Sequence, residues 1–195
     1  MIWINGIMDG IKIFAWCVGP AYVILQLAVM MATKKFNLAR FLLVGSFLLY
    51  LCCVFALTFL PLPSMERATS LVYEVELMPL HCLVDVAEKP VKGTMLILFN
   101  VLMTVPFGMF LRYYFGLDAK RVFLYSLALT TLIEFGQFSG LFFIFKGSYR
   151  LFEVDDLILN TLGGMLGYYL ICKAENKLPE RKCHEKAWTV SLELS

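Results

Sequence analysis

Acidic and amide side chains recur at helical spacing in the second half of the chain, within stretches that are otherwise apolar. Glu134 and Gln137 lie inside the run Arg121–Phe145, and Asp156 and Asn160 are four residues apart in the next run. Carboxylates can transfer protons or hold a divalent cation, and amides can orient a polar group. A charge at mid-depth in a membrane costs roughly 2.5 to 3.5 kcal/mol, so such residues usually face a protein interior or a wet cavity. These residues are therefore candidates for a functional site.

The composition places these residues in a membrane protein. The chain has 195 residues, of which 60% are hydrophobic and only 16% are charged, and its mean hydropathy is +0.76. A soluble domain has about 25% charged residues. The net charge of +2 is small and the basic residues form no single face, so a nucleic-acid partner is excluded.

Five apolar segments are each close to the roughly 20 residues that a bilayer core requires. The sequence therefore predicts an all-α integral membrane protein with five transmembrane helices. The predicted spans are Ile11–Thr33, Phe41–Leu60, Gly93–Phe115, Arg121–Phe145 and Asp156–Cys172. Gly19 and Pro20 should kink the first span, because proline lacks the backbone donor that a helix interior needs.

The basic residues predict the orientation of these spans. The loops after the first and third spans, with the span ends beside them, and the C-terminal tail together hold 11 of the 17 Lys and Arg residues. Because basic residues accumulate on the cytoplasmic side, the N-terminus should lie outside and the C-terminus inside. The expected organisation is two N-terminal transmembrane helices (1–62), an outer loop (63–92), a three-helix core (93–173) and a cytoplasmic tail (174–195).

The outer loop has its own helical pattern. Ser64 can cap a short helix in which Met65, Ala68, Val72 and Val75 recur at near-helical spacing. We expect an interfacial helix on the outer leaflet, and a solvated loop helix is the alternative.

Cysteine and histidine spacings predict neither a zinc site nor a disulfide framework. His81, Cys82 and Asp85 lie close together, but no further Cys or His is nearby, so we interpret them as loop residues. We expect no metal and no cofactor. The carboxylates of the later spans nevertheless form an oxygen-rich group that could bind a divalent cation.

Polar stripes on the last three spans should meet at one depth in the outer half of the membrane. Each stripe is built from residues about four apart, which share one face of a helix. The stripes are Asn100, Thr104 and Gly108; Ser126, Thr130, Glu134 and Gln137; and Asp156, Asn160, Gly163, Gly164 and Gly167. Arg150 lies at the mouth of this region, where a guanidinium can pair with a carboxylate or a phosphate.

Small residues in the same spans predict close helix packing. Pro106 can open the backbone of its helix, and the glycines expected to pack are Gly108, Gly136, Gly140, Gly163 and Gly167. Two alternatives follow for the polar residues. The carboxylates of Asp155 and Asp156 can cap the N-terminus of their own helix, and the whole cluster can be a network that joins three helices without a ligand.

The residues also resemble a known family. Four motifs carry a resemblance to the VanZ-like membrane family. They are Asn100 with Pro-Phe-Gly at 106–108, Ile-Glu at 133–134 with Gln137, Arg150, and VDDLILNTLGGMLG at 154–167. The resemblance covers about residues 78 to 170, beginning with ELMPL. It implies a multi-pass protein of the bacterial cell membrane, in a family linked in some members to lower sensitivity to the glycopeptide teicoplanin. The resemblance also implies which positions belong to the family's motif. They are Asn100, Pro106, Gly108, Glu134, Gln137, Arg150, Asp155, Asp156, Asn160, Gly163 and Gly167.

Three functions are consistent with this pattern. The first is binding or modulation of a cell-envelope lipid or lipid-linked wall intermediate in an outward-facing polar pocket formed by Asn100, Glu134, Gln137, Arg150, Asp155, Asp156 and Asn160. The second is a membrane-surface enzyme that uses the carboxylates of Glu134, Asp155 and Asp156 on a lipid substrate. The third is a small transporter, suggested by the mid-membrane carboxylate. Binding is favoured over catalysis because the two histidines, His81 and His184, lie outside the predicted spans and the carboxylates match no recognised metal motif.

Overall fold

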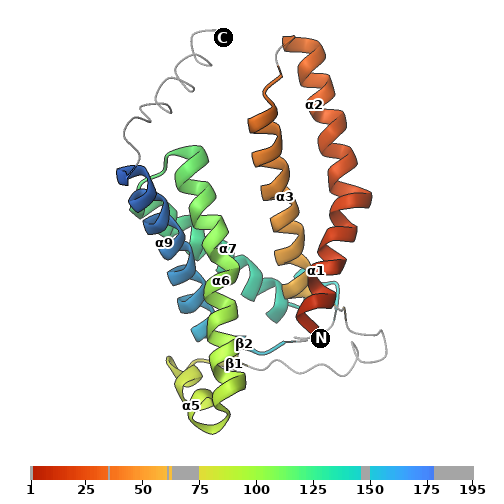
Figure 1. Cartoon of the computed structure of the whole chain (residues 1–195). Helices are drawn as coiled ribbons and strands as arrows, with labels where there is room; N and C mark the ends of the chain where they lie inside the picture. Colours follow the sequence, from red (N-terminus) through yellow and green to blue (C-terminus); the bar gives the residue numbers. More distant parts are fainter. Residues whose placement is uncertain (1, 35, 61, 63–74, 146–149, 178–195) are drawn as a thin grey trace. The chain divides into compact units, whose positions relative to one another are not determined.

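The computed structural model describes residues 2–34, 36–60, 62, 75–145 and 150–177 (Figure 1). The chain forms two compact units. One contains residues 1–74 and 135–151, and the other contains residues 75–134 and 152–195. Helix α7 (Ala119–Phe138) passes from the second unit into the first, because the division falls after Glu134.

The first unit is built on two long helical segments. Its elements are α1 (Ile2–Ile13), the π-helix η1 (Phe14–Val18), α2 (Gly19–Thr33), α3 (Leu38–Phe59) and α8 (Gly140–Phe143). Glycine allows α1 to pack closely on α3, because a β-carbon on Gly10 would lie 2.5 Å from the Cα atom of Cys53. Farther along, Tyr22 stacks on Phe41 and donates its hydroxyl to the Phe41 carbonyl at 2.8 Å.

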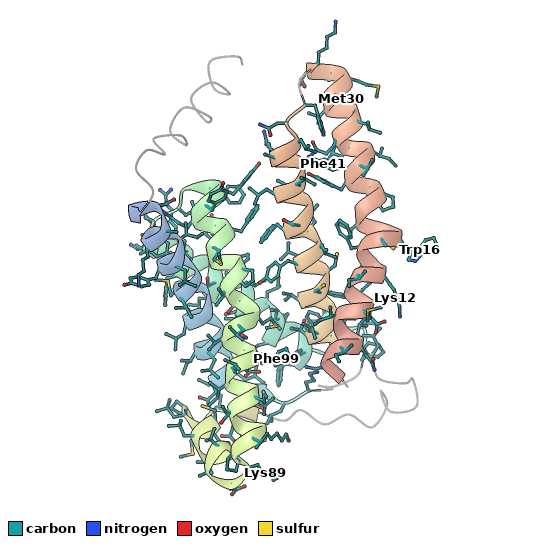
Figure 2. The ribbon with its side chains drawn as sticks, in the orientation of Figure 1. Lys12, Trp16, Met30, Phe41, Lys89 and Phe99 are labelled. Carbon is teal, nitrogen blue, oxygen red and sulfur yellow. The ribbon has the colours of Figure 1, made fainter. Side chains whose placement is uncertain are left out.

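The interruption expected at Gly19 and Pro20 takes the form of the π-helix η1. The Gly19 amide donates to the carbonyl of Phe14, five residues earlier, and helix then continues through Pro20. A π-helical turn accommodates one extra residue and suits a point where proline removes a donor from the ladder. Trp16 in this turn is 83% exposed and points away from α3 (Figure 2).

The span predicted over Arg121–Phe145 is not one continuous helix. Helix α7 ends at Phe138, where the Ser139 hydroxyl accepts the Phe142 amide at 3.1 Å. Gly140 and the next three residues have positive φ angles, which end right-handed helix at this point. Apart from Ser139 and Gly140, residues 138–145 are apolar and do not predict this break.

Four helical segments are long and apolar enough to cross a membrane, among the residues that the structure describes. They are Ile4–Thr33, Leu38–Phe59, Pro90–Phe115 and Val154–Glu175. Helix α7 is not one of them, and it carries Lys120, Arg121 and Glu134 as well as Gln137. The count of five spans and the orientation stay predictions. The interfacial helix expected from Ser64 lies outside the described residues except for Val75, which is in a strand.

The second unit contains the helices of the last three predicted spans, with α7 included only as far as Glu134. Besides most of α7, its elements are β1 (Val75–Glu76), α5 (His81–Glu88), α6 (Pro90–Phe115), β2 (Phe152–Glu153) and α9 (Val154–Lys177). The two short strands pair in parallel, with Val75 opposite Phe152. Neither this strand pair nor α5 was predicted from the sequence, and the α5 residues His81, Cys82 and Asp85 were expected in a loop.

Helices α6 and α9 lie side by side (Figure 1) and approach each other closely at glycines. A β-carbon on Gly108 would lie 1.8 Å from the Gly164 carbonyl oxygen, and one on Gly167 would lie 2.1 Å from the Val105 oxygen. At the far end of this contact, the Arg112 guanidinium pairs with the Glu175 carboxylate at 2.8 Å. Glycine is therefore required for the observed distance between the two backbones.

Replacing Gly108 by alanine should destabilise the second unit. The new methyl group would overlap a backbone carbonyl that cannot rotate away, and overpacking of this kind costs about 1 to 3 kcal/mol. Thermal unfolding of the detergent-solubilised protein should show a clearly lower Tm for Gly108→Ala. Gly45→Ala is the matched control, since its methyl would meet only the Tyr22 ring at 3.3 Å. Equal Tm values for the two variants would contradict the close contact.

Candidate functional site

The candidate site begins with a pair of side chains that joins α6 to α9. The Asn100 amide nitrogen donates to a carboxylate oxygen of Asp156. Both residues are half-buried, so the pair lies at the edge of the three-helix core. An amide and a carboxylate together can accept hydrogen bonds from a polar group and donate to it.

Deeper in the core the polar side chains are buried and bond to one another. Asn160 donates from its amide to the Thr130 hydroxyl at 3.1 Å. The Thr104 hydroxyl donates to the Asn160 carbonyl at 2.6 Å, which connects α6 to α9 a second time. The Thr130 hydroxyl lies 3.4 Å from the Asp156 carbonyl oxygen. Hydroxyl and amide groups from all three helices thus form one network.

Glu134 lies on the same face of α7 and is 1% exposed. Its carboxylate accepts the Glu153 backbone amide at 3.5 Å, which connects α7 to strand β2. This contact places a carboxylate inside the protein beside the entry to α9. The stripe expected on α7, Ser126 with Thr130 and Glu134, is therefore a buried face.

Asp155 holds a helix other than its own. One carboxylate oxygen accepts the Leu80 amide at 2.6 Å and the other accepts the Cys82 amide at 2.7 Å. These amides belong to the start of α5, which has no side-chain cap among its own residues. Free amides at a helix start need acceptors, and carboxylates are favoured there. The expectation that Asp155 caps its own helix is therefore wrong, because the amides that it accepts belong to the start of α5.

Gln137 and Arg150 belong to the first unit. The Gln137 amide donates to the Thr58 carbonyl at 2.8 Å, at the end of α3. Arg150 is exposed and its guanidinium lies 3.5 Å from the Leu57 carbonyl oxygen. Gly136 is in the same unit, where a β-carbon would lie 2.8 Å from the Phe59 ring. Five of the seven predicted site residues lie in the second unit and these two lie in the first.

Glu153 was missed by the sequence analysis. Burial raises the pKa of its carboxyl group above the ordinary value, and the negative charges of Asp85 and Asp155 raise it further. The nearby His81 acts in the opposite direction and lowers the pKa. The signal in the sequence was a third acidic residue two positions before Asp155.

Cysteine and histidine chemistry adds little to the site. Burial raises the pKa of the Cys82 thiol, and its interaction with the Asp155 carboxylate raises that pKa further. A raised pKa keeps the thiol protonated and unreactive. Within the described ranges, no three His, Cys, Asp or Glu residues are grouped to hold a metal ion.

Comparison with known proteins identifies the family. The model of the VanZ/LLP1 family matches residues 47–174, which is more than half of the chain. The chain belongs to the VanZ/LLP1 family. The VanZ/LLP1 match begins at Phe47 within α3, so it extends well before the ELMPL segment at which the sequence resemblance starts. It includes every predicted site residue from Asn100 to Asn160. No curated protein and no solved structure matched the chain.

Removing the Asp155 carboxylate should release α5 in this VanZ/LLP1 protein. Asp155→Ala leaves two amides without acceptors, and the loss of a cap costs about 0.5 to 2 kcal/mol. Hydrogen exchange of the Leu80 and Cys82 amides should therefore accelerate roughly 2- to 30-fold, since 1.4 kcal/mol is tenfold. Asp156→Asn is the control, because its contact is with Asn100. Unchanged exchange in Asp155→Ala would show that other groups hold α5.

The pKa of Glu153 predicts a dependence of stability on pH. Because the folded-state pKa is raised, the folded protein binds a proton more readily than the unfolded chain. Stability contributed by this group is therefore present at low pH and is lost as pH rises through the raised pKa. Glu153→Gln should be more stable than wild type above that pH and should flatten the pH profile of Tm. An unaltered profile would refute the assignment.

Proposed function

We propose that this VanZ/LLP1 membrane protein binds a cell-envelope lipid, or a lipid-linked wall intermediate, through the polar head group. The observation that carries the proposal is the Asn100–Asp156 pair. It is half-buried at the edge of the core, whereas Glu134, Asp155 and Asn160 are buried. A ligand that approaches the second unit from the surface therefore meets this pair first.

The chemistry of the pair favours a head group rich in donors. The Asp156 carboxylate accepts hydrogen bonds from hydroxyl or amino groups, and the Asn100 amide can accept and donate beside it. Exposed apolar side chains on the same helices include Leu96, Leu102 and Ile158, which suit acyl or isoprenoid chains. Amino sugars and amino-alcohol phospholipids both combine such a head group with a long apolar chain.

Arg150 is a second candidate contact, proposed for phosphate. It is exposed and its guanidinium has donors in a fork that matches phosphate oxygens. Because Arg150 belongs to the first unit, its contribution is a separate proposal with its own variant. Gln137 is buried and bonded to a backbone carbonyl, so we assign it a structural role.

Binding is favoured over the enzyme alternative by the contacts of the carboxylates. Asp155 already accepts two backbone amides at the start of α5, one on each carboxylate oxygen. Glu134 accepts a backbone amide inside the protein. A general base needs an approach to the substrate proton, and of the three carboxylates Asp156 alone is half-buried.

Lipid analysis of the purified protein tests the proposal. A head-group lipid should co-purify with wild type and fall about tenfold or more in Asp156→Asn, since hydrogen bonds to charged groups contribute about 1.5 to 3 kcal/mol. Asp9→Asn is the matched control, because Asp9 forms a surface pair with Lys12. Equal lipid recovery from Asp156→Asn and Asp9→Asn would contradict the proposal, and Arg150→Ala reports separately on phosphate.

The cellular role that we propose is in the bacterial plasma membrane, as a modulator of glycopeptide sensitivity. The support is membership of the VanZ/LLP1 family together with four helices that can cross a membrane. A sensitive bacterium that expresses the wild-type protein should grow at a higher teicoplanin concentration than the same bacterium expressing Asp156→Asn. Equal sensitivity of cells with and without the protein would contradict this role while leaving the lipid experiment unaffected.

A further inference from the structure

Two buried polar atoms in the three-helix core have no hydrogen-bond partner among the described residues. They are the Ser126 hydroxyl oxygen and the Asn160 side-chain carbonyl oxygen. Ser126 is 1% exposed and Asn160 is 2% exposed, so neither atom reaches the surface. Buried side-chain polar atoms in proteins nearly always bond to protein or to ordered water. Each of these two atoms therefore requires a partner.

Both atoms lie along the same seam between α7 and α9. Ser126 contacts α9 at Gly164, where a β-carbon would lie 2.1 Å from the hydroxyl oxygen. Asn160 contacts α7 at Thr130, with 3.1 Å between its amide nitrogen and the hydroxyl. Residues four apart on a helix are separated by about 6 Å along the axis. The contacts that Ser126 and Asn160 make across this seam are thus about one helical turn apart.

That spacing suits one bridging molecule. About 6 Å is too long for a direct hydrogen bond, but it equals two bonds of roughly 2.8 to 3 Å in series. The Ser126 hydroxyl can donate and the Asn160 oxygen can accept, so the bridge must both accept and donate. A water molecule does both, and it would do so for either orientation of the Asn160 amide.

We propose that one water molecule bound between Ser126 and Asn160 is a structural part of the core. It completes the network that already contains Thr104, Thr130 and Asp156. It also connects α7, the helix that carries Glu134, to α9 at a second level. A helix bundle within a bilayer has no bulk water around its polar groups. The partner must therefore be a water molecule bound at this one position.

Magnetic resonance detects the water directly. We would label the asparagine side chains of the full chain with ¹⁵N in lipid bilayers and measure magnetisation transfer from water. The Asn160 side chain should show a water cross-peak in wild type, and Ser126→Ala should abolish it. Thr131→Val, an exposed change on the same helix, should retain it. Absence of the wild-type cross-peak, or its survival in Ser126→Ala, would overturn the proposal.

The sign of the stability change is a second measurement. With the bridge present, Ser126→Ala should lower Tm, because the Asn160 oxygen loses its partner. Without a bridge, the variant removes an unpartnered hydroxyl and Tm should stay constant or rise. Ser126→Ala and Asn160→Ala should also be non-additive in Tm, whereas Thr131→Val and Asn160→Ala should add. A constant or higher Tm in Ser126→Ala, or additivity of the first pair, would overturn a structural role for the water.

Discussion

The close approach of α6 and α9 is the constraint on which the rest of the second unit depends. The Gly108 Cα lies against the backbone of Gly164, and the glycines at 163 and 167 face backbone carbonyls of α6. Because no side chain separates the two helices there, short polar groups can bridge them. The Thr104 hydroxyl reaches a carbonyl of α9, and Asn100 reaches Asp156. Larger residues at these positions would move both bonds out of range.

Asp155 shows how the core organises the segment before it. Its carboxylate accepts two amides at the start of α5, although 75 residues separate Asp155 from Leu80. The parallel pairing of β1 with β2 brings the same two chain segments together immediately beside this contact. The helix α5 therefore begins where α9 begins, and a charged residue of the core sets the position of a segment outside it.

The parts of the fold that the sequence predicts well are those that follow from local pattern. The spans α6 and α9 follow from apolar runs, with Pro90 suited to the first turn of α6. The buried face of α7 follows from the spacing of Ser126, Thr130 and Glu134. Helix α5 could not be predicted in this way, since its cap comes from Asp155. The end of α7 at Phe138 was missed because the residues after it remain apolar.

The π-helix η1 also sets the rotational phase of the first long helical segment. One residue corresponds to about 100° of rotation in an α-helix. The extra residue in Phe14–Val18 therefore turns the face of α1 relative to that of α2. With this offset, Gly6 and Gly10 of α1 and Tyr22 of α2 all meet α3. The extra residue of η1 thus lets the contact faces of α1 and α2 both pack on α3. The number of residues in this turn is therefore as important as their types.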